Sequence, residues 1–261
     1  MQKLRAGEVV SSFKINFACA RTAEIVAMQG FDCVWTDREH TANDWDLIER
    51  QVWATKAHDA DLMVRVSRGS YSECVCALEV DAAGIMVPHV MSLEDARTVV
   101  RTTRFHPIGR RALDGGNADG RYAEVETREY IREANAERFV AIQIEDPEPL
   151  AEIDAIAALD GIDMLFFGPG DFSQGIGAPG EWDHPEIARV CALIPQVCAA
   201  HGKFAGTVGD TGSLNRLIDM GYRFINVGAD VVGLSSYCRG IVEAFRRAPE
   251  TTRGVTRGVV Q

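Results

Sequence analysis

Short apolar segments recur along the whole chain, separated by longer segments of mixed apolar and polar residues. Each apolar segment is rich in β-branched, aromatic or other apolar residues, with little alternation between apolar and polar positions. Such a pattern is typical of parallel strands that are buried on both faces. It predicts eight strands, over residues 13–17, 33–36, 62–66, 84–88, 139–144, 164–168, 203–208 and 223–227.

The segments between the predicted strands carry helix signals. Gly30 follows one periodic segment as a C-cap, Asn43 and Asp44 are suitable N-caps, and Ser92 opens a capping-box pattern. These signals predict helices over residues 22–29, 42–60, 92–103, 185–201, 212–220 and 232–247.

Strands that alternate with helices from one end of the chain to the other predict a parallel α/β architecture. Eight such units in 261 residues fit a (β/α)8 TIM barrel, for which about 250 residues is typical. A doubly wound open sheet is the alternative, but no Gly-x-Gly-x-x-Gly follows the first predicted strand. We therefore expect a single barrel domain over residues 1–261.

Three segments depart from this alternation. Residues 104–137 contain several Gly residues, a Pro and many charges, which predicts a long functional or inter-subunit loop with a helix over 127–136. The helix predicted over 232–247 is more apolar than a solvent-facing helix requires, so we expect a homo-oligomer. We expect the tail, residues 249–261, to be frayed or docked on a partner.

Composition and charge narrow the classes of function. The net charge is −11 and no basic cluster is evident, which argues against a nucleic-acid or anionic-membrane partner. No apolar run approaches the ~18 residues of a membrane span. The seven cysteines include no Cys-x-x-Cys pair, and the first residues lack the continuous apolar segment of a secretion signal. We expect a protein of a reducing compartment, the cytoplasm.

Polar and charged residues stand where a barrel carries its chemistry, at the carboxyl ends of the predicted strands. In a closed barrel, side chains at these positions converge on one rim. They are Asp37, Glu39 and His40 after the second strand, Arg65 within the third, Glu145 and Asp146 after the fifth, and Asp171 after the sixth.

Each of these groups admits a functional and a structural interpretation. Glu145 and Asp171 offer hard oxygen ligands that suit Mg²⁺ or Mn²⁺ and tolerate Co²⁺ or Zn²⁺, or they are surface acids at helix N-termini. Arg65 lies between apolar residues and needs an anionic partner, which is either a substrate oxygen or a structural acid. His40 is either a general base or a solvated loop histidine.

The order and spacing of several motifs resemble the HpcH/HpaI aldolase family of class II, pyruvate-type aldolases. The resemblance covers roughly residues 5–247. Its matching segments are Gly30-Phe31-Asp32, Asp37-x-Glu39-His40, Val64-Arg65, Gly84-Ile85-Met86-Val87-Pro88, Arg104-Phe105-x-Pro107-x-Gly109-x-Arg111, Gln143-Ile144-Glu145, Gly168-Pro169-Gly170-Asp171-Phe172-Ser173 and His184-Pro185-Glu186.

The resemblance implies a role for the residues with the most reactive side chains. Glu145 and Asp171 would hold a divalent metal. Arg65 would bind the pyruvyl group and steady the enolate. His40 would act as acid and base through a water molecule.

It also implies the surroundings of the substrate. Gln143 and the backbone at Gly170 and Asp171 would contact the oxo acid, and Asp37 would lie near the aldehyde end or at a subunit contact. The family has an aspartate that pairs with the histidine, and Glu79 stands near its place here. The Gly- and Asp-rich loop 113–121 departs from the family pattern, so we expect it to shape aldehyde choice or subunit packing.

Together these features predict a metal-dependent aldolase that reversibly cleaves 4-hydroxy-2-oxo acids to pyruvate, or a close 2-oxo acid, and an aldehyde. The resemblance implies a trimer or a hexamer. Three alternatives stay open from the sequence. One is an acyl-CoA lyase of the citrate-lyase β type on the same barrel. Another is an enzyme similar to phosphoenolpyruvate mutase or isocitrate lyase, although the sequence shows no cysteine loop for that chemistry. The third is a non-catalytic barrel that binds small molecules.

Overall fold

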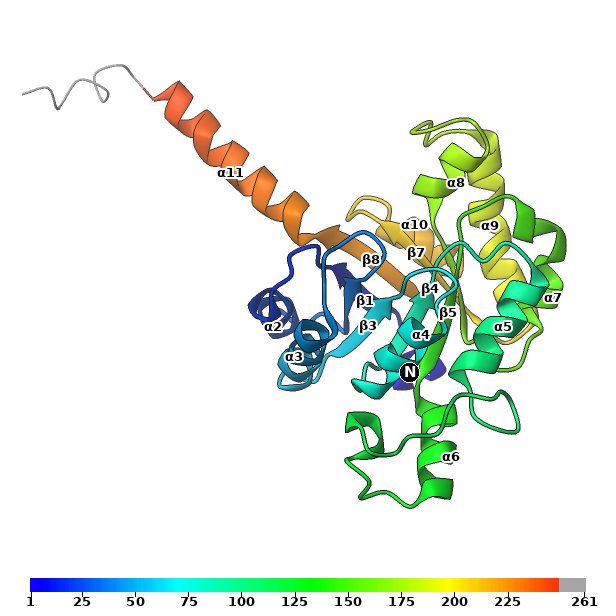
Figure 1. The fold of residues 1–261 in the computed structure, drawn as a ribbon. Coiled ribbons are helices and arrows are strands. Elements are labelled where there is room, and N and C mark those ends of the chain that lie inside the picture. The colour runs from blue at the N-terminus through cyan, green and yellow to red at the C-terminus, as the bar shows by residue number, and fades with distance from the viewer. Residues whose placement is uncertain (249–261) are drawn as a thin grey trace, which may run out of the picture.

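Eight parallel strands form a closed barrel in the computed structural model, which describes residues 1–248 (Figure 1). Neighbours in the barrel are neighbours in the chain, and pairing of the first strand with the last closes the sheet. The predicted (β/α)8 TIM barrel is therefore confirmed. The strands are β1 (Val10–Lys14), β2 (Cys33–Asp37), β3 (Asp61–Arg65), β4 (Gly84–Val87), β5 (Phe139–Ile144), β6 (Met164–Phe167), β7 (Phe204–Gly209) and β8 (Phe224–Ala229).

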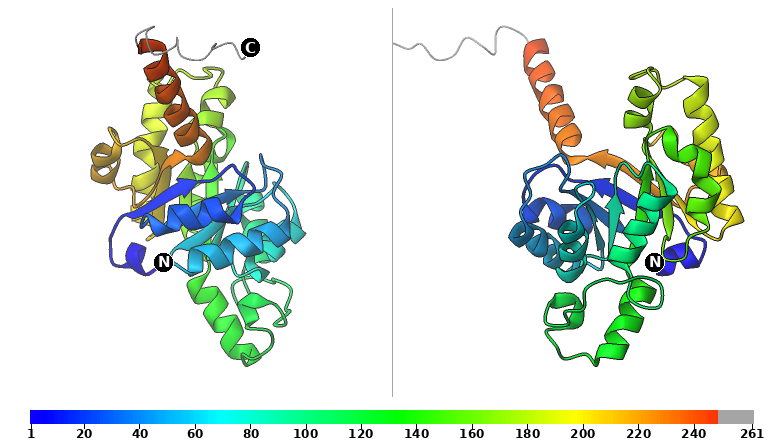
Figure 2. Two further views of the ribbon diagram at one scale, coloured as in Figure 1. Left: turned by 90° about the vertical axis from the view of Figure 1, so that its left-hand side faces the viewer. Right: turned by 45° about the vertical axis from the view of Figure 1, so that its right-hand side comes forward.

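Helices occupy the connections between the strands (Figure 2). Within residues 1–248, none of them is long and apolar enough to cross a membrane. They are α1 (Gln2–Arg5), α2 (Ala20–Met28), α3 (Trp45–Lys56), α4 (Tyr71–Glu79), α5 (Leu93–Thr103), α6 (Thr127–Glu137), α7 (Ile153–Ala157), α8 (Pro169–Gly175), α9 (Pro185–Ala200), α10 (Leu214–Asp219) and α11 (Asp230–Arg247).

Side chains of each strand alternate between the barrel interior and the layer beneath the helices. The interior is filled by a cluster that includes Trp35, Met63, Met86 and Phe166. The residues between them, such as Val64, pack outward in the larger cluster that the helices cover. Both faces are apolar, which explains why the sequence shows no alternation of apolar and polar positions along the strands.

The first strand begins and ends three residues earlier than the sequence indicates. Two serines in it are polar, yet both are satisfied inside the fold. Ser11 donates its hydroxyl to Asp32 (2.8 Å) and Ser12 donates to Asn226 on β8 (3.3 Å). Because these hydrogen bonds offset the cost of burying a hydroxyl, a segment that resembles a loop forms a strand.

Two of the helices that the apolar pattern misses begin at clear N-terminal signals. Helix α4 follows Ser70, whose hydroxyl accepts the backbone N–H of Glu73, an N-cap. Helix α8 begins at Pro169, a residue favoured in the first turn because it lacks an N–H group. The segment Gly168-Pro169-Gly170 therefore starts a short helix.

Residues 104–137 form a separate lobe at the end of the barrel where the strands begin (Figures 1 and 2). The predicted helix 127–136 is present as α6. Arg104, almost fully buried, donates to the carbonyl groups of Gly161 (2.8 Å) and Arg138 (2.6 Å) and so fixes the lobe to the barrel. Asp119 accepts from Arg111 and Tyr130, each at 2.7 Å.

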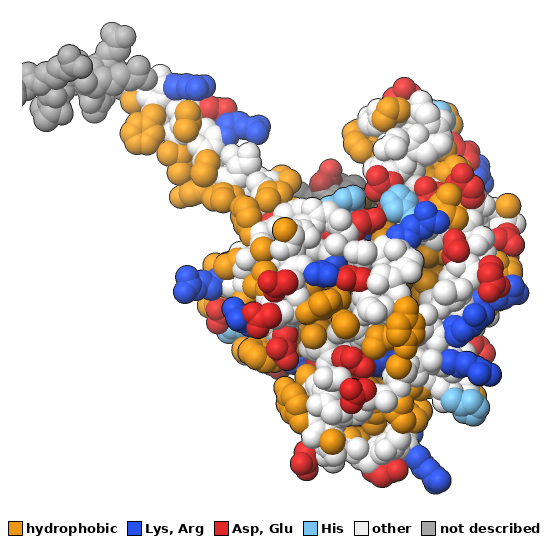
Figure 3. All heavy atoms as spheres, in the orientation of Figure 1, with side chains coloured by type: hydrophobic (Ala, Val, Ile, Leu, Met, Phe, Trp, Pro, Cys, Tyr) orange, Lys and Arg blue, Asp and Glu red, His pale blue; other side chains and the backbone are white. Residues whose placement is uncertain are grey.

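Helix α11 leaves the barrel and projects away from it (Figure 1). None of its residues is buried, although Val232, Leu234, Ile241 and Val242 are large apolar side chains. Figure 3 shows hydrophobic side chains, in orange, along the projecting helix. The part of the expected domain at residues 249–261, including the tail expected to be frayed or docked, lies outside the described residues.

Candidate active site

Three charged residues end three consecutive strands at the C-terminal rim, the end of the barrel at which all strands finish. Lys14 ends β1, Asp37 ends β2 and Arg65 ends β3. Asp37 and Arg65 each lie two residues beyond a member of the inner cluster, Trp35 and Met63. The same alternation points all three charged side chains into the barrel mouth, and strand register places Asp37 directly beside Arg65.

Asp37 is the acid on which both cations converge. Its side chain is 0% exposed and that of Arg65 is 4% exposed. Arg65 donates from Nε to Oδ1 (3.1 Å) and from Nη2 to Oδ2 (2.5 Å), and the ammonium of Lys14 lies 2.9 Å from Oδ2. The backbone N–H groups of Glu39 and His40 also donate to Oδ1. Asp37 is therefore engaged by five donors.

Electrostatics at Asp37 follow from these contacts. Burial opposes ionisation, but the hydrogen bonds and charge of Arg65, followed by Lys14, outweigh it and lower the pKa of Asp37 to about 2. Both cations also lie over the ring of Trp35, with Lys14 Nζ and Arg65 Cζ each 5.0 Å from its centroid. Trp35 forms the floor beneath this charged layer.

The two predicted metal ligands lie on the other half of the rim. Glu145 follows β5 and is buried, and Asp171 lies in the first turn of α8, which follows β6. Burial, together with the nearby charge of Asp171, raises the pKa of Glu145 to about 7 against opposing contributions from His89 and Arg65. Glu145 is thus a carboxylate whose charge the protein leaves partly uncompensated.

The surroundings of Glu145 test whether a cation fits there. Gln143 donates its amide N–H to Glu145, while its own Oε1 is buried without a hydrogen-bond partner. A Cβ atom at Gly168 would come within 2.9 Å of Glu145 Oε2, so only glycine leaves room for this carboxylate. A divalent cation beside Glu145 and Asp171 would balance their charge, and the orphaned oxygen of Gln143 marks a place for a polar ligand.

Two protein carboxylates leave most coordination positions of such a cation open. Within residues 1–248, no group of three or more His, Cys, Asp or Glu side chains is arranged to hold a metal. Oxygens of substrate and water would therefore complete the coordination, as open catalytic metal sites require.

His89 is a residue of this rim that the sequence reasoning missed. It follows the fourth strand with a left-handed backbone, φ +48°, and its N–H donates to Glu145 (2.9 Å). Its ring Nδ1 lies 2.9 Å from Asp146, and its Nε2 lies 3.6 Å from Glu39. Burial lowers the pKa of His89, but the acids Asp146, Glu145 and Glu39 outweigh it and raise the pKa. In the sequence, its position just after the fourth strand is the signal that could have identified His89 as a rim residue.

Glu39 links His89 to the other predicted groups. One of its oxygens lies 3.2 Å from Arg65 Nε and 3.4 Å from His40 Nε2. The ring of His40 is 54% exposed, so it borders the rim from the solvent side. The acid beside His40 is Glu39, whereas Glu79 ends α4 near Arg111, at the opposite end of the barrel.

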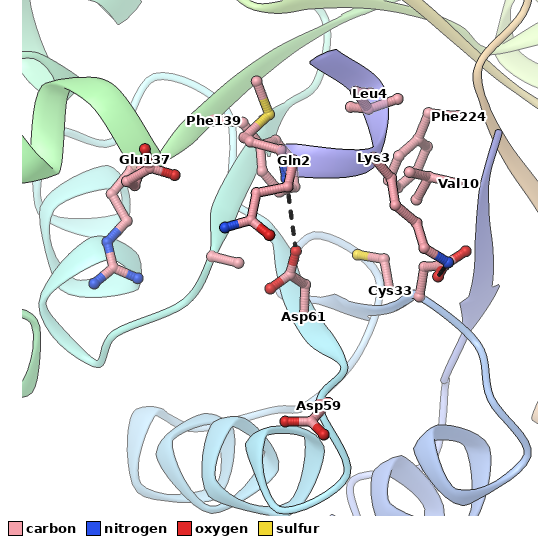
Figure 4. Close-up of a pocket in the computed structure, with 14 residues that line it drawn as sticks. Gln2, Lys3, Leu4, Val10, Cys33, Asp59, Asp61, Glu137, Phe139 and Phe224 are labelled. Carbon is pink, nitrogen blue, oxygen red and sulfur yellow. Dashed lines mark hydrogen bonds and ion pairs between the residues drawn. The ribbon is translucent and has the colours of Figure 1, made fainter. Parts of the chain in front are cut away.

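Two other features lie away from this rim within the chain. The loop 113–121 belongs to the lobe at the barrel base, so it does not line the site of its own subunit (Figure 1). A cavity at the base is lined by α1 and the strand beginnings, with Asp61 facing the N-terminal amine (Figure 4). Around that cavity, Lys3 pairs with Asp32 and the N-terminal amine faces Asp61, so its charged groups form separate ion pairs.

Comparisons with known proteins match this chain over most of its length. The family model described as HpcH/HpaI aldolase/citrate lyase matches residues 15–236. A hydroxypyruvate/pyruvate aldolase of Roseobacter denitrificans is 32% identical over 250 residues, which cover 94% of this chain and 96% of that protein. A 2-keto-3-deoxy-L-rhamnonate aldolase of Klebsiella pneumoniae is 33% identical over 231 residues, covering 88% and 86%.

Solved structures share the whole barrel. An HpcH/HpaI aldolase from Desulfitobacterium hafniense superposes with a TM-score of 0.89 and 27% identity, covering 95% of this chain and 96% of that one. The citrate synthase SbnG gives a TM-score of 0.86 with 25% identity, covering 94% and 96%.

Proposed function

Since the chain belongs to the HpcH/HpaI aldolase/citrate lyase family, we propose that its C-terminal rim performs metal-dependent cleavage of 4-hydroxy-2-oxo acids to pyruvate, or a close 2-oxo acid, and an aldehyde. The chain is a carbon–carbon lyase of the aldolase kind, like the relatives that are about one-third identical to it. These aldolase relatives do not favour the acyl-CoA lyase alternative.

The observation that carries the proposal is the division of the rim into two halves. Glu145 and Asp171 form an acidic half with an uncompensated charge. Arg65 supplies the positive charge of the other half, across the barrel mouth. A 2-oxo acid has the matching chemistry, because its carboxylate and oxo oxygens are ligands for a hard cation and its developing enolate needs a nearby positive charge.

The chain's own residues have separate tasks in this scheme. Glu145 and Asp171 would hold Mg²⁺ or Mn²⁺, with Co²⁺ or Zn²⁺ also suited to the oxygen ligands. A divalent cation bound there supplies Lewis-acid polarisation of the 2-oxo group. Gln143 and the backbone at Gly170 and Asp171 would orient the oxo acid, and Asp37 would hold Arg65 in place.

Bond cleavage then moves one proton and one electron pair. His40, through water, accepts the proton of the 4-hydroxyl group. The C3–C4 bond breaks and the aldehyde leaves. The electron pair of that bond stays with the oxo acid and forms the enolate, which Arg65 steadies. Protonation at C3 yields pyruvate. No lysine is needed as a Schiff base.

Pyruvate release coupled to a dehydrogenase tests this function. Several 4-hydroxy-2-oxo acids should be cleaved in a reaction that stops on chelation and resumes with Mg²⁺ or Mn²⁺. Glu145→Ala should abolish the metal-dependent reaction while the far-ultraviolet spectrum stays unchanged. Glu94→Ala, at an exposed acid on α5, is the matched control. Full activity after exhaustive chelation would contradict the proposal.

We further propose that the protein is a homo-oligomer, a trimer or a hexamer, in which α11 packs on a neighbouring barrel. The helix presents Val232, Leu234, Ile241 and Val242 to solvent in the single chain. Such an assembly would also allow the loop 113–121 of one subunit to approach the site of another. Light scattering should give a multiple of 28.6 kDa. Leu234→Asp with Ile241→Asp should reduce the mass, whereas Ser236→Asp should not; a wild-type monomer would contradict the proposal.

A further inference from the structure

Lys14 supplies a second cation to the rim that the proposed chemistry does not use. It ends β1, and its side chain lies in the barrel mouth with 19% exposure. Its ammonium lies over the Trp35 ring, with Nζ 5.0 Å from the ring centroid. A lysine at this depth has lost much of its hydration, so its remaining donors gain by contacting a ligand.

Asp37, the ion-pair partner of Lys14, has four other donors. Asp37 already receives two nitrogens of Arg65 and two backbone N–H groups. An ammonium has three N–H donors, and within residues 1–248 its only ion-pair partner is Asp37. Lys14 therefore retains N–H donors beyond its contact with Asp37.

The position of Lys14 around the barrel indicates which part of a substrate it meets. In the closed order β1 to β8, β5 is the strand opposite β1. Glu145 follows β5, and the carboxylate and oxo group of the substrate are expected beside it. Arg65 on β3 lies between the two. The end of the substrate farthest from Glu145, which is the aldehyde half, thus faces Lys14.

We propose that Lys14 is a substrate-binding residue that selects aldehydes carrying a hydroxyl or carboxylate oxygen. Its ammonium donates to that oxygen while Asp37 and Trp35 hold the side chain in position. This inference rests on the proposed aldolase function and adds the chemical class of the aldehyde. Hydroxyl and carboxylate oxygens share the acceptor chemistry, and matched substrates separate them.

Pairs of aldehydes with equal carbon number provide the test in the direction of aldol addition to pyruvate. Propanal is compared with glyceraldehyde, and butanal with succinic semialdehyde. Lys14→Met keeps the apolar stem and removes the ammonium. We expect kcat/KM for at least one oxygen-bearing aldehyde to fall on the order of 10- to 100-fold, mainly through KM, as for the loss of a charged hydrogen bond. Propanal and butanal should change less than about twofold.

Nuclear magnetic resonance can monitor the exchange of the pyruvate methyl protons with solvent. This exchange would become slower if Lys14 had only a structural role beside Asp37. It should be unchanged in Lys14→Met, and Lys56→Met, at the end of α3, should behave as wild type throughout. If Lys14→Met does not fold, Lys14→Gln decides by the same ratios, because glutamine can still donate to Asp37.

Two results would overturn the proposal for Lys14 alone. One is an equal loss for all four aldehydes together with slower proton exchange, which would make Lys14 a structural partner of Asp37. The other is no change in any ratio. By contrast, a wild-type enzyme that neither exchanges pyruvate protons nor adds any aldehyde would refute the aldolase function itself, and the Lys14 proposal with it.

Discussion

Replacing Asp37 with asparagine removes the negative charge on which Arg65 and Lys14 converge, and its effect can be estimated from the structure. The pKa of Asp37 falls from 3.8 to about 2 in the folded protein. Each unit corresponds to ~1.4 kcal/mol, so the ionised form contributes about 2 kcal/mol to the free energy of unfolding at neutral pH. Loss of one partner of a buried ion pair costs about 3–5 kcal/mol. Because asparagine retains an oxygen for the N–H groups of Glu39 and His40, we expect Asp37→Asn to cost about 2–3 kcal/mol.

Urea unfolding of wild type and Asp37→Asn as a function of pH measures this contribution. A carboxyl with a lowered folded-state pKa stabilises the protein above its unfolded pKa and loses that effect as pH falls through its folded pKa. The difference between the two proteins should therefore be constant above about pH 5 and shrink between about pH 4 and pH 2. Asp46→Asn, at an exposed acid of α3, should change stability by less than about 0.5 kcal/mol.

The same variant connects stability to catalysis. In Asp37→Asn, Arg65 loses the negative charge and the acceptor of its Nη2 and keeps only an acceptor for Nε, so kcat/KM should fall about 100-fold even at pH 7, where the protein is folded. If Asp37→Asn unfolds like Asp46→Asn, Asp37 does not anchor the two cations. If it is destabilised yet fully active, the position of Arg65 does not depend on Asp37, and our reasoning about this layer is wrong.

Three further outcomes are expected. Glu145 has a raised pKa of about 7 and must release its proton to bind a cation, so apparent metal affinity should rise about tenfold per pH unit up to about pH 7 and then level off; calorimetry that finds no such pH dependence contradicts this. Arg65→Lys keeps the charge but loses the planar fork, and kcat/KM should fall on the order of 10²–10³; near-normal kinetics would make Arg65 only an ion-pair partner. His40→Ala should slow aldol cleavage much more than pyruvate proton exchange, and equal losses would mean that His40 only holds the site together.

The parts of the fold that the sequence predicts are those with a local signal. Seven of the eight predicted strand segments overlap their strands closely, because an interior run of apolar residues is buried on both faces. The first strand was misplaced because Ser11 and Ser12 are satisfied by Asp32 and Asn226, which are remote in sequence. A local pattern contains no information on such partners.

In the site, too, the features with a local sequence signal could be predicted and those that depend on remote partners could not. Position after a strand was enough to identify Asp37, His40 and Glu145 as rim residues, and apolar flanks were enough to predict a partnered Arg65. The same rule applied to the fourth strand would have found His89. Which oxygen meets which nitrogen depends on the register between strands. The spare N–H donors of Lys14 beside Asp37 therefore become visible only in three dimensions.

The two halves of the rim differ in how the protein offsets the burial of charge, and that difference orients a substrate. On the β1–β3 side, the cost of burying Arg65 is offset by Asp37, so this layer is held rigid before any ligand arrives. On the β5–β6 side, Glu145 has no full counter-charge from the chain, which its raised pKa records. A cation is attracted to the second half and an anionic or polar oxygen to the first. In the proposed function, a 4-hydroxy-2-oxo acid would satisfy both halves with its oxo acid end toward β5 and its aldehyde end toward β1. The direction in which the carbon–carbon bond lies across the barrel therefore follows from where the protein has left charge uncompensated.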